Sequence, residues 1–181
     1  MAQPDCPCAK DLGTLLHMAP LPYLAGYSEE LQAQARTLLA QGKLAPLLAK
    51  RYPDGHQVRS NKTLTTYVQE LKARHMRTAA PLGQVLFDDR LHVVHKALGL
   101  HTTTTRAHGK KLKKRREVRV ASLFKNTPAA FLRMIVVHEL AHMKHAAHDR
   151  DFYRLCIHME PEYHRVELDL RLYLTLQEWD V

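Results

Sequence analysis

The chain has 181 residues, of which 45% are hydrophobic, and it carries a formal net charge of +9. This length suits one domain, or one domain with a helical extension, and the apolar content suffices for a hydrophobic core. No apolar run approaches the roughly 18 residues of a membrane span, and the N-terminus lacks the pattern of a signal peptide. We therefore expect a cytoplasmic globular protein that does not enter membranes.

The three cysteines are too few and too unevenly spaced for a disulfide framework. Cys6 and Cys8 could bind a metal, but without a second pair of cysteines they more simply belong to a disordered tail. Cys156 lies in an apolar helical pattern, and we expect it to be a small buried hydrophobic residue.

Residues 21–80 are expected to form a helical N-terminal portion. Ser28 is a good N-cap for a helix that extends to Leu48, and Gly42 and Pro46 should break that helix into two pieces. Tyr52–Gly55 has the composition of a turn, after which Asn61 caps a second helix. The apolar side of the second helix is expected to contain Leu64, Tyr67, Val68 and Leu71.

After Pro81 the composition shifts towards short runs with high β propensity. The expected strands are Val85–Phe87, Leu100–Thr105 and Val118–Ser122. Arg90–Leu98 is ambiguous between helix and strand, and Ala107–Lys110 is expected to form a hairpin turn. The strand from residue 117 to 123 should run beside the next helix and offer its free edge to an extended peptide.

Most of the excess positive charge lies in one segment. The segment contains eight basic residues and one glutamate: Arg106, Lys110, Lys111, Lys113, Lys114, Arg115, Arg116, Glu117 and Arg119. A cluster of this kind, densest in Lys110–Arg119, suits a phosphate backbone or an acidic partner. The two interpretations are therefore a nucleic-acid contact and a solvated hairpin.

The next expected helix starts at Pro128 and continues to about His145. It contains His138-Glu-Leu-Ala-His142, in which two histidines lie four residues apart and project from one helical face. Two imidazoles placed in this way can share one zinc ion. The surrounding residues are apolar, which predicts a buried helix in which both histidines need partners.

Glu139 lies one residue further round the same helix. Its carboxylate is poorly placed to be a third ligand, but it can deprotonate water whose pKa a zinc ion has lowered. This is the arrangement of a zinc-dependent peptidase with Glu139 as its general base. A purely structural zinc site would need a fourth ligand and no general base.

A catalytic zinc ion usually has three protein ligands and one open position, so a third ligand must be found. His148 follows the two histidines at a distance that lets the helix end and the chain double back. Glu162 or Glu167 could instead come from a later helix. His145 continues the helical face, but in an unbroken helix it lies about 10.5 Å along the axis from the first histidine.

Two further helices are expected, one over Arg150–Met159 and one that opens at Pro161. Val166–Leu176 alternates apolar and polar residues with period two, which alone favours a strand. We interpret it as a helix, because its apolar positions are almost all leucine and Glu167 and Arg171 form an i, i+4 pair.

Several residues close to the two histidines in the sequence are further candidates. Asp149 either orients a ligand imidazole or caps the following helix. Met159 is expected to be a core residue. The candidates for stabilising the oxyanion of a tetrahedral intermediate are Tyr153, His158 and Tyr163.

Three segments carry a family resemblance, namely His138–Phe152, Met159–Tyr163 and Leu170–Leu174. Together they resemble the YgjP-like family of bacterial zinc metallopeptidases. At longer range the chain is similar to the SprT/Spartan and Wss-type proteases, which share His-Glu-x-x-His followed six residues later by a third histidine.

The resemblance implies that a Zn²⁺ ion is bound by His138, His142 and His148. It also implies that Glu139 is the general base and that the last segment of the chain is helical. Metzincins have a glycine where this chain has His145, and that glycine lets the backbone turn with positive φ. The chain therefore departs from the true metzincin pattern.

We expect an α+β fold with a zincin-like catalytic core, in which a small sheet packs on the active-site helix, plus an N-terminal helical portion. The expected division is a tail at residues 1–20, the helical portion at 21–80 and the metallopeptidase core at 81–181. The expected reaction is hydrolysis of a peptide bond in a protein or peptide substrate. The alternative is a nucleic-acid-associated or scaffold protein with a structural zinc or without peptidase activity.

Overall fold

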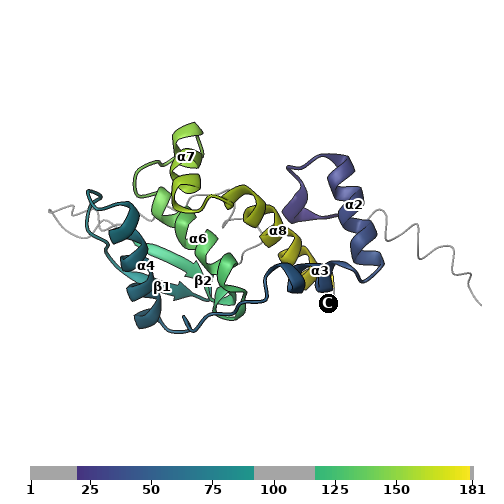
Figure 1. Ribbon diagram of the computed structural model, residues 1–181, viewed down its shortest axis with the longest axis horizontal. Coiled ribbons are helices and arrows are strands. Elements are labelled where there is room, and N and C mark those ends of the chain that lie inside the picture. Colours follow the sequence, from purple (N-terminus) through teal and green to yellow (C-terminus); the bar gives the residue numbers. More distant parts are fainter. Residues whose placement is uncertain (1–19, 92–116, 180–181) are drawn as a thin grey trace, which may run out of the picture. The chain divides into compact units, whose positions relative to one another are not determined.

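The computed structural model describes residues 20–91 and 117–179 (Figure 1). The fold is α+β, as expected, because helices accompany a small sheet of two parallel strands. Contacts group the described residues into two units, one comprising residues 20–51 and 171–179 and the other residues 52–91 and 117–170. The division expected at residues 20 and 80 stays a prediction, and Cys6 and Cys8 lie outside the described residues.

The first unit contains η1 (Pro22–Leu24), α2 (Glu29–Ala40), α3 (Leu44–Arg51) and the end of α8 (Tyr163–Trp179). Ser28 caps α2 as expected, since its side chain accepts a hydrogen bond from the backbone N–H of Leu31. The break at Gly42 is confirmed, and its φ of 63° is one that glycine adopts without strain. The break at Pro46 is wrong. Pro46 lies in the first turn of α3, where its missing N–H costs no helical hydrogen bond.

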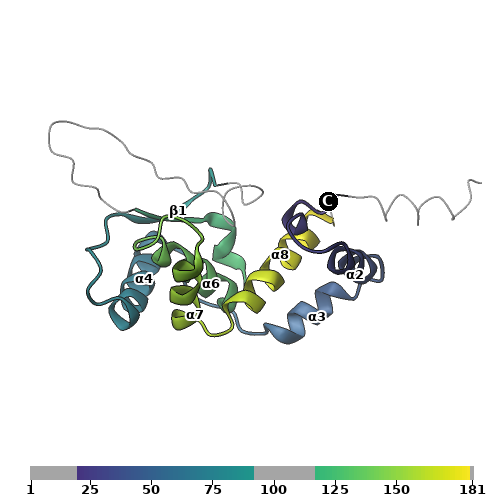
Figure 2. The ribbon, with the colours of Figure 1, turned by 90° about the horizontal axis from the view of Figure 1, so that it is seen from above.

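The second unit is built on β1 (Val85–Asp88) and β2 (Val118–Ala121), which pair in parallel with Val85 opposite Val118. Both strands were expected from the sequence. The helices α4 (Asn61–His75) and α6 (Ala129–Ala141) lie side by side on one face of this sheet, with α4 against β1 and α6 against β2 (Figure 2). The expectation that substrate pairs with the other edge of β2 stays a prediction.

Two sequence predictions near the start of α4 are wrong. The N-cap is Ser60, which forms a capping box with Thr63, and Asn61 instead accepts a hydrogen bond of 2.8 Å from the N–H of Phe87 in β1. No regular turn forms over residues 52–55. There the carbonyl of Asp54 accepts a hydrogen bond of 2.9 Å from Ala129, so this segment is fixed to the start of α6.

The expected strand Leu100–Thr105, the hairpin turn Ala107–Lys110 and most of Arg90–Leu98 lie outside the described residues. Only the end of the basic segment is described. There Arg119 donates hydrogen bonds to Asp88 at 2.9 Å and to Glu117 at 2.8 Å. The charge of Arg119 is therefore already compensated by two carboxylates.

The chain continues from β2 through η2 (Ser122–Asn126) and α6 to α7 (Arg150–Met159) and α8. Both C-terminal helices were expected, and the helical interpretation of the alternating segment is confirmed. In α8 the buried residues of the second unit recur at helical spacing: Tyr163, Val166, Glu167, Asp169 and Leu170. Within residues 20–91 and 117–179, none of the helices combines the length and apolar character that a membrane span requires.

Candidate metal centre

The helix that carries the first two histidines is buried on almost every side. Nine of the thirteen residues of α6 are buried, including His138, which is only 4% exposed. This confirms the expectation drawn from its apolar sequence. A polar imidazole in such surroundings needs a partner for each ring nitrogen.

α6 ends at Ala141, earlier than the expected end near His145, and His142 occupies its C-cap. Beyond it the N–H of His145 donates a hydrogen bond of 3.0 Å to the carbonyl of Ala141. Among the described residues no residue other than glycine has positive φ, so the chain turns here without the left-handed residue that metzincins use. This early end allows the chain to return His148 to the helix.

Three imidazoles meet at one point. The Nε2 atom of His142 lies 3.1 Å from that of His138, and the Nε2 atom of His148 lies 3.2 Å from each of the other two. Nitrogens bonded to one tetrahedral zinc ion at about 2.0–2.1 Å lie about 3.3 Å apart. The three nitrogens therefore have the spacing of a zinc site, and they form the one such group of metal-binding side chains in the described ranges.

The nitrogen on the opposite side of each ring decides whether Nε2 can bind a metal. Nδ1 of His142 lies 2.9 Å from the carbonyl oxygen of His145. A carbonyl only accepts, so Nδ1 carries the proton and Nε2 keeps its lone pair. Nδ1 of His138 lies 2.7 Å from the hydroxyl of Tyr163, which is fully buried in α8.

Phe152 packs against all three imidazoles. Its ring centre lies 5.1 Å from that of His138, 4.5 Å from that of His142 and 4.7 Å from that of His148. Asp149 fixes this phenylalanine, because its carboxylate caps α7 by accepting a hydrogen bond of 2.8 Å from the N–H of Phe152. Asp149 thus acts as a helix cap, one of the two roles expected for it.

Glu139 follows His138 on α6 and is half-buried. Burial raises the pKa of its carboxyl to about 7. A carboxylate with a pKa close to neutral is well suited to accept a proton from water at physiological pH.

The other candidate ligands lie outside the group of three histidines. Glu162 is exposed and forms an ion pair of 2.9 Å with Arg165. Glu167 is buried on α8, and it is not part of the cluster. His145 contributes its backbone carbonyl to the site, as described above.

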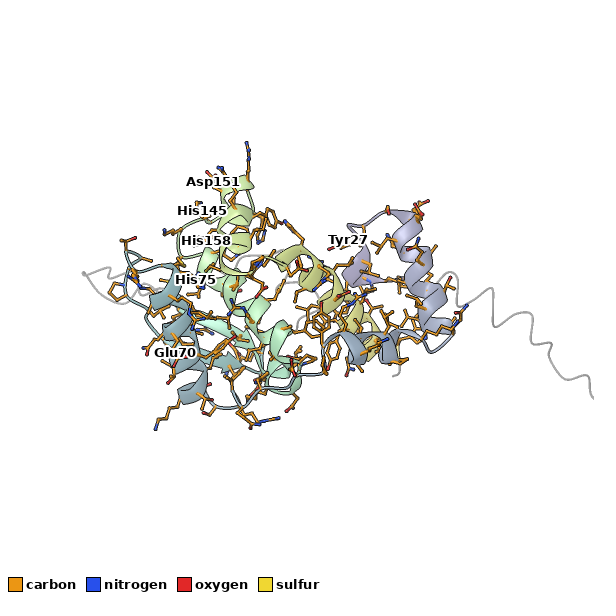
Figure 3. The ribbon with its side chains drawn as sticks, viewed as in Figure 1. Tyr27, Glu70, His75, His145, Asp151 and His158 are labelled. Carbon is orange, nitrogen blue, oxygen red and sulfur yellow. The ribbon has the colours of Figure 1, made fainter. Side chains whose placement is uncertain are left out.

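The three candidates for an oxyanion donor are in different positions. Tyr163 bonds to Nδ1 of His138, on the side of the ring away from the meeting point. His158 lies next to His75 of α4, with 5.7 Å between ring centres (Figure 3). The ring centre of Tyr153 lies 6.2 Å from that of His148. Met159 is buried, as expected.

Sequence reasoning overlooked two contacts around the histidines. One is the packing of Phe152 under all three rings. The other is the contact of 2.7 Å between the Tyr163 hydroxyl and Nδ1 of His138. Cys156 is also buried, as expected. Burial raises the pKa of the Cys156 thiol to about 12 and raises the pKa of the Tyr163 hydroxyl well above its usual range. Both groups therefore stay protonated at neutral pH.

Comparisons with known proteins identify the family of the chain. A family model described as "YgjP-like, metallopeptidase domain" matches residues 17–173. The chain is also 51% identical over 158 residues to a protein of Escherichia coli K12 named UTP pyrophosphatase, a match that covers 87% of this chain and 95% of that protein. No solved structure matches the chain. The resemblance expected from the sequence is thus confirmed, and the chain belongs to the YgjP-like family.

Proposed function

We propose that the chain is a zinc-dependent hydrolase whose first candidate substrate is a nucleoside triphosphate. The meeting of three Nε2 atoms next to a half-buried glutamate carries the proposal of hydrolysis. The substrate class is inferred from the relative named UTP pyrophosphatase, because the match extends over 95% of that protein. The positive net charge of +9 also suits a polyanionic substrate.

In this proposal His138, His142 and His148 hold the zinc ion. Zinc, when bound, polarises a substrate oxygen and makes water more acidic. Glu139 accepts the proton of the attacking water, and the water then cleaves a phosphoanhydride bond. The products are a nucleoside monophosphate and inorganic diphosphate. Phe152 closes one side of the histidine group to water and keeps the rings in place. Diphosphate leaves as an anion, so this reaction needs no protonation of an amine.

The second candidate function is hydrolysis of a peptide bond. It is favoured by the pattern His138-Glu139-x-x-His142 with a third histidine on the following turn, the arrangement of zinc peptidases. Glu139 would then also pass its proton to the leaving amine. The open edge expected on β2 is the place where an extended peptide would pair.

One experiment separates the two candidates. Zinc-loaded protein is incubated with UTP and, separately, with an unfolded protein, and the release of UMP, diphosphate and new amino termini is measured. We expect UMP and diphosphate from the wild type and neither product from Glu139→Gln. Cleavage of the protein substrate alone would favour the peptidase, and unchanged UTP hydrolysis by Glu139→Gln would place that activity outside this site.

A further inference from the structure

A pair of aromatic side chains connects the histidine group with the protein surface. The ring centre of Tyr153 in α7 lies 6.2 Å from that of His148 and 5.3 Å from that of His164, the second residue of α8. Tyr153 is half-buried, whereas the side chain of His164 is 58% exposed. Ring contacts therefore lead from a candidate metal ligand to a ring that solvent reaches.

Both rings are held by the residues around them. Tyr153 packs on Phe152, with 5.3 Å between ring centres, and His164 packs on buried Tyr163 at 5.5 Å. Nδ1 of His164 also lies 3.9 Å from a carboxylate oxygen of Glu167. These contacts fix the two rings before any ligand arrives, which lowers the entropy lost when a ligand binds to them.

An exposed ring beside a catalytic centre suits a flat ligand. Tyrosine and histidine rings are among those on which proteins stack nucleic-acid bases. The substrate proposed above has one such base, which a ribose joins to the phosphates. Tyr153 is one ring contact away from His148, and His164 is two. A nucleotide with its phosphates at the histidine group can therefore place its base on this pair.

We propose that Tyr153 and His164 form an aromatic platform on which the base of a nucleoside triphosphate stacks. The inference rests on the proposed hydrolysis of a nucleoside triphosphate, and it adds the residues that bind the base. Stacking requires only the flat π surface that all bases share. The platform therefore contributes affinity for the nucleoside and does not by itself select uracil.

The first test measures binding without turnover. Zinc-loaded Glu139→Gln is titrated with UTP and, separately, with inorganic triphosphate in a calorimeter. UTP should bind more tightly, because inorganic triphosphate has no base. Adding His164→Ala should weaken the binding of UTP about 5- to 100-fold, the usual effect of removing a ring from a base stack, and leave the binding of inorganic triphosphate unchanged.

Two outcomes would overturn the proposal in distinguishable ways. If Glu139→Gln binds UTP and inorganic triphosphate equally, the phosphates are bound but the base is not, so the platform is refuted and the proposed hydrolysis stands. If neither compound binds, the proposed substrate class fails and the platform fails with it.

His158→Ala in the same Glu139→Gln background is the matched control. It removes another exposed histidine of the same unit, one that lies next to His75 of α4. We expect it to leave the affinities for UTP and for inorganic triphosphate unchanged. An equal loss of UTP affinity in His158→Ala and His164→Ala would contradict a specific role of His164.

Variants of Tyr153 separate the ring from the hydroxyl. In the Glu139→Gln background, Tyr153→Leu should abolish the preference for UTP over inorganic triphosphate, and Tyr153→Phe should restore it, because phenylalanine keeps the ring. If Tyr153→Phe loses the preference as fully as Tyr153→Leu, the hydroxyl makes the contact and stacking on Tyr153 is refuted. A loss that came from damage to the metal site would weaken the binding of inorganic triphosphate as well.

Discussion

The Nδ1 atom of His142 lies 2.9 Å from the carbonyl oxygen of His145, three residues further along the chain. This contact uses the backbone of residue 145 and leaves its imidazole outside the group of three histidines. The turn after α6 thus orients one candidate ligand with its own carbonyl while it returns His148 to the site.

The first prediction compares the two histidines of this turn. His145→Ala should leave the zinc dissociation constant nearly unchanged, because the carbonyl that orients His142 remains. His148→Ala should weaken zinc binding by more than the roughly 10- to 100-fold that loss of a group bonded to a ligand costs. Zinc content after dialysis and chelator competition provide the measurement. Metal loss from Glu162→Ala, with none from His148→Ala, would contradict the assignment.

The second prediction concerns Glu139. Glu139→Gln preserves the shape of the side chain but cannot accept a proton, so turnover should fall by about 10²- to 10⁴-fold while zinc content and fold persist. Product release from UTP measures the fall in turnover, and metal analysis of the same sample measures the zinc content. If the variant loses its zinc, Glu139 is a ligand and the general-base role is wrong.

The sequence predicts the part of the site that is set by helical periodicity. His138 and His142 are four residues apart, so a helix alone brings them together, and the apolar residues around them predict the burial that is observed. The position of His148 depends on where α6 ends and on the cap that Asp149 forms for α7. The local sequence pattern does not determine these contacts. The family resemblance was therefore needed to choose among the candidate ligands.

Contacts between residues distant in the sequence were the hardest to predict. Tyr163 of α8 lies 25 residues from His138 of α6, so the contact of 2.7 Å between their side chains could not be predicted from local pattern. The misplaced cap at Asn61 has a similar cause, because Asn61 is an acceptable cap by composition but bonds to β1. Pro46 was expected to break a helix. It lies in the first turn of α3, where a proline removes no helical hydrogen bond.

The third prediction is a pH dependence of stability that arises from His56. Burial lowers the pKa of its imidazole. In the neutral form Nδ1 accepts a hydrogen bond of 3.1 Å from Val58, and Nε2 bonds to the carbonyl of Phe124 at 2.9 Å, ahead of α6. Protonation would place a second donor opposite the N–H of Val58.

The sign follows from proton binding. The unfolded chain takes up the His56 proton at a higher pH than the folded chain, so acidification through about pH 6.5 favours the unfolded state. We expect the free energy of unfolding of the wild type to fall more than that of His56→Asn between pH 7.5 and 5.5. Urea titrations of both metal-free proteins test this, because the three site histidines are common to both. If the free energy of unfolding changes with pH in the same way in both proteins, His56 does not contribute to the pH dependence of stability.

The last prediction concerns the basic segment Lys110–Arg119, which we propose binds nucleic acid through its phosphates. Affinity should then be independent of sequence and should fall steeply with salt, because each neutralised phosphate releases counterions. Replacing Lys113, Lys114, Arg115 and Arg116 by serine should flatten the salt dependence and leave zinc content unchanged. Arg119→Ser is the control, since the Arg119 charge is already compensated by Asp88 and Glu117 and its loss should change the slope little.

Fluorescence anisotropy with single-stranded and duplex DNA measures this binding, and UTP hydrolysis by the same variants measures the competing role of the segment. If the four-serine variant raises the KM for UTP and the wild type does not bind DNA even at low salt, the charge serves the triphosphate and nucleic acid is not a partner. If neither property changes, the segment is a solvated hairpin. Salt-dependent binding that is lost in the four-serine variant and kept in Arg119→Ser supports the nucleic-acid contact.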